Sequence, residues 1–186
     1  MALAGVLAAG ALLATAAPPD LIDWQPSLAP AQPWRAWSAV FVHYSALHLA
    51  ANLAAAALVG ALGRVARVPR RCTWAWLAAW PLAHVGLLLQ PALLHYGGLS
   101  GVLHAGVAVV ALHLLVTGAA RRIGVAMLLV LVAKVLSEAP WSGPVSHPAG
   151  WDIAIAPLAH ASGLVAGIAC ALIAEGLARR SRHRPS

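Results

Sequence analysis

Long apolar runs separated by short polar segments form the main pattern in this sequence. Each run has roughly 16 to 23 residues, and about 20 helical residues cross the hydrocarbon core of a bilayer. The six runs lie approximately at residues 2–17, 39–61, 72–93, 100–119, 123–138 and 157–178. Polar and apolar positions do not alternate along them, as they would in the strands of a membrane barrel. The pattern predicts an all-α membrane protein built as a bundle of six transmembrane helices.

Composition agrees with a membrane environment. The chain is 61% hydrophobic and only 9% charged, which is more apolar surface than a soluble domain of 186 residues can bury. We expect a single membrane domain over residues 1–186, with a short N-terminal span at 2–17 and a basic cytoplasmic tail at 179–186. Residues 14–18, Ala-Thr-Ala-Ala-Pro, also resemble a signal-peptide cleavage site, so retention of the first span stays open.

Basic residues are concentrated in alternate loops. Those after the second, fourth and sixth runs are Arg64, Arg67, Arg70, Arg71, Arg121, Arg122, Arg179, Arg180, Arg182 and Arg184. The positive-inside rule makes these ends cytoplasmic, together with both termini. The opposite loops, which hold Asp20, Asp23, Arg35 and Asp152, then face outward. The net charge of +7 is explained by this topology, and it is spread too widely for a nucleic-acid surface.

Several polar residues within the spans have ordinary packing explanations. Cys72 and Cys170 fall toward the cytoplasmic side, where thiols stay reduced, so we predict no disulfide. His84 and His113 are single histidines on their helices, and we expect them to form hydrogen bonds between helices. None of these four residues is assigned to a site.

Two other positions on the second span form a pair. His48 and Asn52 are four residues apart and so lie on one face of that helix, in its outer half. Both side chains can donate hydrogen bonds in the same direction. The pair alone is equally compatible with packing between helices.

A serine lies at a glycine-rich entry into the fourth span. Gly98 and Gly101 flank Ser100 and permit a sharp approach to the helix, and the positive helix end favours an anion near the serine. Serine is also a common helix cap, so this short motif gains catalytic meaning only from a partner base.

The sixth span offers that base. His160 lies among small residues that recur every fourth position, and the fourth span has a matching small face at Gly101 and Ala105. If these faces pack, Ser100 and His160 approach each other near the outer leaflet. Histidine is the usual activator of a serine nucleophile.

The acidic residues give no obvious third catalytic member. Glu175 is about 22 Å along the helix from His160, which is too far to orient its ring. The other acids, Asp20, Asp23, Glu138 and Asp152, lie in or near outer loops and are not excluded by distance, but none has a helical spacing to His160. We therefore expect a Ser100/His160 dyad. The chain has neither a His-Glu-x-x-His zinc motif nor a buried Asp pair, and we predict no metal or cofactor.

Taken together, these motifs resemble the rhomboid intramembrane serine proteases over roughly residues 30–178. The matching segments are Trp34-Arg35, His43-Tyr-Ser-Ala-Leu-His48-Leu-Ala-Ala-Asn52, Gly98-Leu-Ser100-Gly101 and His160-Ala-Ser-Gly163-Leu-Val-Ala-Gly167. The resemblance implies that Ser100 attacks a peptide carbonyl and His160 takes its proton. It also implies that His48, Asn52 and the Ser100 amide stabilise the oxyanion, and that Trp34 and Arg35 belong to a structured outer loop.

One position departs from the usual rhomboid pattern. Many rhomboids have a tyrosine four residues after the serine, and this chain has His104, which we expect to pack on His160. The Gly-Leu-Ser-Gly-Val-Leu-His-Ala segment, the short chain, and Lys134 with Glu138 on the fifth span resemble the rhombosortase branch. That resemblance implies a bacterial inner-membrane enzyme with its active site toward the outer face. It implies substrates with a C-terminal Gly-Gly motif, a transmembrane helix and a basic tail.

The fifth span carries an opposite-charge pair. Lys134 and Glu138 share one helix face, and a charge within a span costs about 2.5 to 3.5 kcal/mol unless it finds a partner. The pair is explained equally well as a local ion pair or as a substrate gate. Between the second and fifth helices, where rhomboid substrates are thought to enter, it would hold the gate or read the substrate.

Two alternative functions remain. A general-purpose rhomboid would cleave membrane proteins without a dedicated tag. A transporter of metal or haem would use the five outer histidines, His43, His48, His95, His104 and His160. The transporter leaves the Ser100 turn and Asn52 without a purpose. An inactive protease homologue is less consistent, because both members of the dyad are present.

Overall fold

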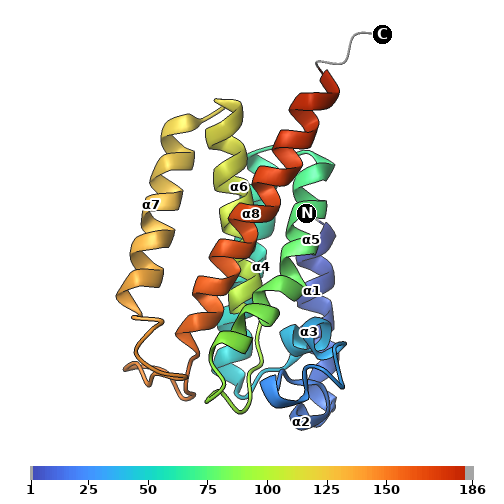
Figure 1. Cartoon of the computed structure of the whole chain (residues 1–186), viewed down its shortest axis with the longest axis vertical. Helices are drawn as coiled ribbons and strands as arrows, with labels where there is room; N and C mark the ends of the chain where they lie inside the picture. The colour runs from blue at the N-terminus through green and yellow to red at the C-terminus, as the bar shows by residue number, and fades with distance from the viewer. Residues whose placement is uncertain (1, 183–186) are drawn as a thin grey trace.

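Helices form nearly all of the regular structure in the computed structural model, which describes residues 2–182 (Figure 1). The basic tail expected at 179–186 is therefore described only in part, and Arg184 lies outside the described residues. The six longer helices are α1 (Ala2–Leu13), α4 (Ala46–Val65), α5 (Arg70–Val85), α6 (Ser100–Thr117), α7 (Arg121–Ser137) and α8 (Pro157–Arg182). Short turns of helix, α2 (Pro19–Ile22) and α3 (Arg35–Ser38), lie in the loop between α1 and α4.

Four of the helical segments are long and apolar enough to cross a membrane. They are Ala46–Val65, Arg70–Leu89, Ser100–Thr117 and Pro157–Ser181, the second of which joins α5 to the 3-10 turn η4 (Gly86–Leu89). The apolar segment Ala2–Ala16 is shorter, and α7 has 17 residues. The prediction of a multi-pass helical membrane protein is confirmed. The count of six spans remains a prediction, because α1 and α7 fall below this length.

The second predicted span begins seven residues too early. Residues 39–41 form a 3-10 turn, and α4 starts at Ala46. Ser45 is extended and its hydroxyl accepts the hydrogen bond of the His48 amide at 3.0 Å, which caps the helix. Apolar content alone could not detect this boundary, because residues 39–42 are as apolar as the helix.

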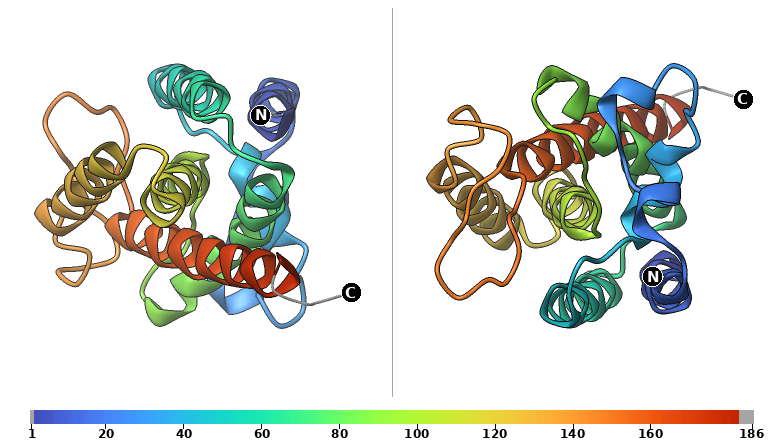
Figure 2. Two further views of the ribbon diagram at one scale, coloured as in Figure 1. Left: turned by 90° about the horizontal axis from the view of Figure 1, so that it is seen from above. Right: turned by 90° about the horizontal axis from the view of Figure 1, so that it is seen from below.

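Helix α6 lies at the centre of the bundle and contacts α4, α5, α7 and α8 (Figure 2). Its contact with α8 is very close: a Cβ added to Gly167 would lie 2.6 Å from the Ala105 oxygen, and one added to Gly101 would lie 2.8 Å from the Ala159 oxygen. The predicted packing of the two small faces is confirmed. Because both helices begin at the same end of the bundle, their first turns lie side by side (Figure 1).

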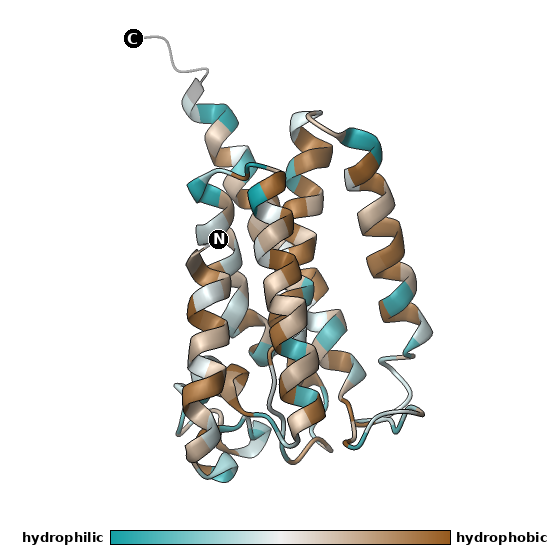
Figure 3. Cartoon of the chain, turned by 180° about the vertical axis from the view of Figure 1, so that it is seen from behind, coloured by the Kyte–Doolittle hydropathy of each residue, from teal (hydrophilic) through white to brown (hydrophobic). Residues whose placement is uncertain are grey.

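Polar residues gather at the ends of the bundle, with a few inside it (Figure 3). The arginines of the α4–α5 and α6–α7 connections lie at the end opposite the start of α6 (Figure 1). At the other end, Arg35 is buried and donates to Asp23 Oδ1 at 3.1 Å and to the Asp23 carbonyl at 2.7 Å. Burial, together with the Asp23 carboxylate, raises the pKa of the nearby Tyr44 hydroxyl. Arg35 thus anchors a structured loop, whereas Trp34 is exposed.

Candidate active site

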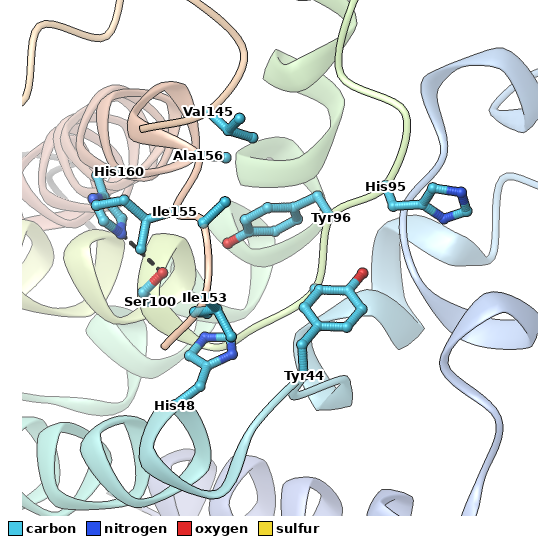
Figure 4. Close-up of a pocket in the computed structure, with 12 residues that line it drawn as sticks. Tyr44, His48, His95, Tyr96, Ser100, Val145, Ile153, Ile155, Ala156 and His160 are labelled. Atoms are coloured by element: carbon cyan, nitrogen blue, oxygen red, sulfur yellow. Dashed lines mark hydrogen bonds between the residues drawn. The ribbon is translucent and has the colours of Figure 1, made fainter. Parts of the chain in front are cut away.

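Ser100 and His160 meet where α6 and α8 begin. Gly98 has a φ of +131°, a conformation that glycine adopts easily, and it turns the chain so that Ser100 becomes the first residue of α6. His160 lies in the first turn of α8 and is buried. Its Nε2 is 2.9 Å from the Ser100 Oγ (Figure 4). This is the distance of a serine hydroxyl that donates to a general base.

His48 and Asn52 lie against the same turn. A Cβ added to Gly98 would be 2.7 Å from His48 Nε2 and 3.8 Å from Asn52 Nδ2, so glycine is required here for close approach as well as for φ. Both side chains are buried. Asn52 Nδ2 uses one of its two N–H groups to donate to the His48 carbonyl at 3.1 Å, which leaves the second for another acceptor. Figure 4 shows the His48 ring and the His160 ring near the Ser100 hydroxyl.

His104 packs on the histidine that faces the serine. The His104 and His160 rings stack with centroids 4.3 Å apart and an interplanar angle of 14°, so the predicted packing is confirmed. His104 Nδ1 is 2.7 Å from the Ser100 carbonyl oxygen, one turn earlier on α6. A carbonyl only accepts, so His104 carries its proton on Nδ1.

Lys134 and Glu138 form the expected local pair, with Nζ and Oε1 2.8 Å apart. The other carboxylate oxygen, Oε2, lies 2.6 Å from His160 Nδ1. Lys134 Nζ also donates to His104 Nε2 at 2.8 Å. The sequence predicted a Ser100/His160 dyad with no neighbouring acid, whereas in the structure the Glu138 carboxylate contacts His160. Helical spacing missed Glu138 because it reaches His160 from a different helix.

A loop between α7 and α8 covers the site. Ser146 and Ile155 pair as an isolated bridge within it, and Ser45 donates its hydroxyl to Asp152 at 2.8 Å, which fastens this loop to the start of α4. Only a small cavity of about 40 Å³ remains on the side lined by Tyr44, His95, Tyr96, Ile153 and Ile155 with Ser100 and His160 (Figure 4). No sequence pattern indicated that this loop covers the serine.

A larger cavity opens on the other side of the serine. It has a volume of about 320 Å³, and its polar lining includes His48, Asn52, Ser100, His104, Lys134, Glu138 and His160. An apolar groove of about 550 Å³ lies between α4, α6 and α7, and its polar end is formed by His104 and Lys134. All ten of the residue positions proposed from the sequence thus lie at or beside one region, with Gly101 and Gly163 at the α6–α8 contact.

A second polar cluster lies on the other half of the bundle. Glu175 accepts from Arg71 with both oxygens at 3.1 Å, and its Oε1 is 2.7 Å from His113 Nδ1 and 3.7 Å from Cys72 Sγ. Because Arg71 donates to both carboxylate oxygens, the polar groups of this cluster satisfy one another in a hydrogen-bond network that connects α5, α6 and α8. Within residues 2–182, no three of the five outer histidines lie close enough to share one ion.

The Rhomboid domain family matches residues 30–175 of the chain. The protein therefore belongs to the rhomboid family of intramembrane serine proteases. A search of curated proteins found no significant match.

Proposed function

We propose that this protein is an intramembrane serine endopeptidase in which Ser100 is the nucleophile and His160 its general base. The observation that carries the proposal is the 2.9 Å contact between Ser100 Oγ and His160 Nε2, beside two buried donors at the Gly98 turn. A serine hydroxyl alone is a weak nucleophile, and an adjacent imidazole activates it.

The reaction follows from these positions. His160 Nε2 takes the Ser100 proton as Oγ bonds to the peptide carbonyl carbon, and the C=O electron pair moves onto oxygen. The tetrahedral intermediate collapses, the C–N bond breaks, and His160 returns its proton to the leaving amine. Water then attacks the acyl-enzyme with His160 again as the base, which releases the acid and restores the serine.

The oxyanion needs donors that are already in place. His48, Asn52 and the Ser100 backbone amide supply them in our proposal, since both side chains border Gly98 and the amide opens α6. Such a donor is worth roughly 3 to 4 kcal/mol in hydrolases that depend on it. Because the His48 and Asn52 side chains are buried, little reorganisation is needed when the charge develops.

The membrane arrangement that we propose has six spans in one domain over residues 1–186. Helices α1 and α7 would complete the four longer spans, and local thinning of the bilayer can accommodate short helices. The arginine-rich connections support cytoplasmic termini in a bacterial inner membrane, with Ser100 toward the outer face.

The substrates that we propose are membrane proteins with a C-terminal Gly-Gly motif, a transmembrane helix and a basic tail. The apolar groove between α4 and α7 supports binding of a transmembrane segment. Lys134 lies at the polar end of this groove and pairs with Glu138, which supports a role of the pair in holding the gate or in reading the substrate. Glycines unwind easily from a helix, which a protease requires of a scissile segment. The alternative function, a general-purpose rhomboid protease, differs only in that its substrates need no such tag.

The test uses purified protein in detergent or vesicles. A fluorophosphonate probe should label the wild type, and Ser100→Ala should abolish labelling. Ser100→Ala and His160→Ala should each remove cleavage of a tagged membrane substrate without loss of helix content. Absence of labelling in a folded wild-type protein, or substantial cleavage by Ser100→Ala, would contradict the mechanism.

Substrate choice is tested in the same assay with a second substrate. Replacing Gly-Gly by Leu-Leu should block processing while Ser100 labelling by the probe stays unchanged. Equal cleavage of both substrates would favour the general-purpose reading.

A further inference from the structure

We propose that Glu138 completes a Ser100–His160–Glu138 triad, in which its carboxylate fixes the tautomer and orientation of His160. This inference rests on the proposed protease function. It replaces the dyad expected from the sequence, and it gives the charged pair on α7 a direct connection to the chemistry.

The argument begins with His160 Nδ1. A carboxylate accepts and cannot donate when ionised, so the 2.6 Å contact with Glu138 Oε2 requires the proton of His160 to lie on Nδ1. Nε2 is then unprotonated and able to accept from Ser100 Oγ at 2.9 Å. This is the tautomer that a general base needs, and the opposite tautomer could not take the serine proton.

Lys134 makes this selection necessary. Its Nζ is 3.0 Å from His160 Nδ1, and an ammonium has only donors. In the absence of Glu138, the ammonium would donate to Nδ1 and favour a proton on Nε2, which blocks the base. It would also oppose the positive charge that forms on His160 during the reaction. Glu138 pairs with the Lys134 ammonium and accepts from His160 Nδ1. It therefore offsets both the unfavourable tautomer and the charge repulsion.

The contacts form a closed ring that begins and ends at the serine. Ser100 Oγ donates to His160, His160 to Glu138, and Lys134 to Glu138 and His104; His104 in turn donates to the Ser100 carbonyl. The stacking of His104 on His160 further restricts the orientation of the His160 ring. Lys134 and His104 are therefore positioning residues that hold Glu138 and the imidazole in place.

The decisive experiment measures the rate of fluorophosphonate labelling of Glu138→Gln. The probe is small and soluble, so it reaches Ser100 without entry of a transmembrane helix. The triad predicts that labelling and kcat both fall by at least about 100-fold, with KM nearly unchanged, since an amide cannot enforce the required tautomer. A role in the substrate gate alone predicts normal labelling with slow cleavage of the membrane substrate.

Glu175→Gln is the matched control. It makes the same chemical change at a buried carboxylate that also contacts a histidine, His113, away from the site. It should label at the wild-type rate even if its Tm falls. Normal labelling of Glu138→Gln beside a labelled wild type would overturn the triad and leave the proposed protease function intact.

A second variant keeps the test informative if Glu138→Gln folds poorly. Glu138→Ala opens space beside His160 at a side chain that is 18% exposed, so a small carboxylate from solution can enter. Added formate should restore part of the labelling rate, while neutral formamide should not. Equal rescue by both compounds would show that the carboxylate charge is unnecessary and would overturn the inference.

Discussion

Substitution of Gly163 by alanine should separate the two halves of the active site. A Cβ at this position would collide with the Gly101 carbonyl oxygen and would lie 2.7 Å from the carbonyl carbon and 3.2 Å from the Gly101 Cα. Carbon atoms rest about 3.5 to 4.0 Å apart. Because the obstacle is backbone rather than a flexible side chain, α8 must move away from α6 by about 1 Å.

That displacement acts directly on the catalytic contact. The hydrogen bond between Ser100 and His160, now 2.9 Å long, would stretch to about 4 Å, beyond the reach of general-base catalysis. A misplacement of about 1 Å can cost roughly 100-fold in rate. We expect Gly163→Ala to lower both kcat and the rate of fluorophosphonate labelling by about that factor, while circular dichroism shows retained helix content.

Gly176→Ala provides the matched control on the same helix. Nothing lies within 4 Å of the Cβ added at Gly176, so no movement is required. It should keep full activity, and its stability should rise by up to about 1 kcal/mol, because alanine favours the helix. Wild-type activity in Gly163→Ala would refute the reasoning that close packing of α6 on α8 sets the geometry of the site.

Two further predictions concern residues around the serine and the outer loop. Asn52→Ala should lower kcat by about 100-fold with little change in KM, because an oxyanion donor acts mainly in the transition state; weaker binding at unchanged turnover would assign Asn52 to substrate docking. Arg35→Ala should cost about 3 kcal/mol of stability, measured as a lower Tm, because it removes the buried guanidinium that pairs with the buried Asp23 carboxylate. Trp34→Ala, at an exposed position beside it, should leave Tm nearly unchanged, and equal losses in both variants would contradict this explanation.

Much of the candidate site could be found in the sequence because its signals are local. The spacing of His48 and Asn52 places them on one helix face, and the glycines around Ser100 indicate a tight turn into a helix. The small residues on α6 and α8 predicted a close contact between those helices, which the structure confirms. Helix ends were less accurate, because the start of α4 depends on one hydrogen bond to Ser45.

The role of the charged pair was harder to predict. The i,i+4 spacing of Lys134 and Glu138 revealed the ion pair but gave no information about what else the carboxylate touches. The contact with His160 joins residues that are 22 positions apart on two helices. The hydrogen bond from Ser45 to Asp152, which fastens the loop that covers Ser100, joins residues that are 107 positions apart.

The sequence by itself determined that the chain lies in a membrane, that it is helical, and which pair of residues is proposed for the chemistry. These follow from apolar length, from charge placement and from short-range spacing, all of which act along one chain segment. Only the tertiary structure decided which groups complete that pair. The rotation of α7 about its own axis and its distance from α8 bring Glu138 to His160 Nδ1 and Lys134 to His104. Such contacts depend on how side chains of different helices fill shared space, and no pattern within a single helix encodes that arrangement.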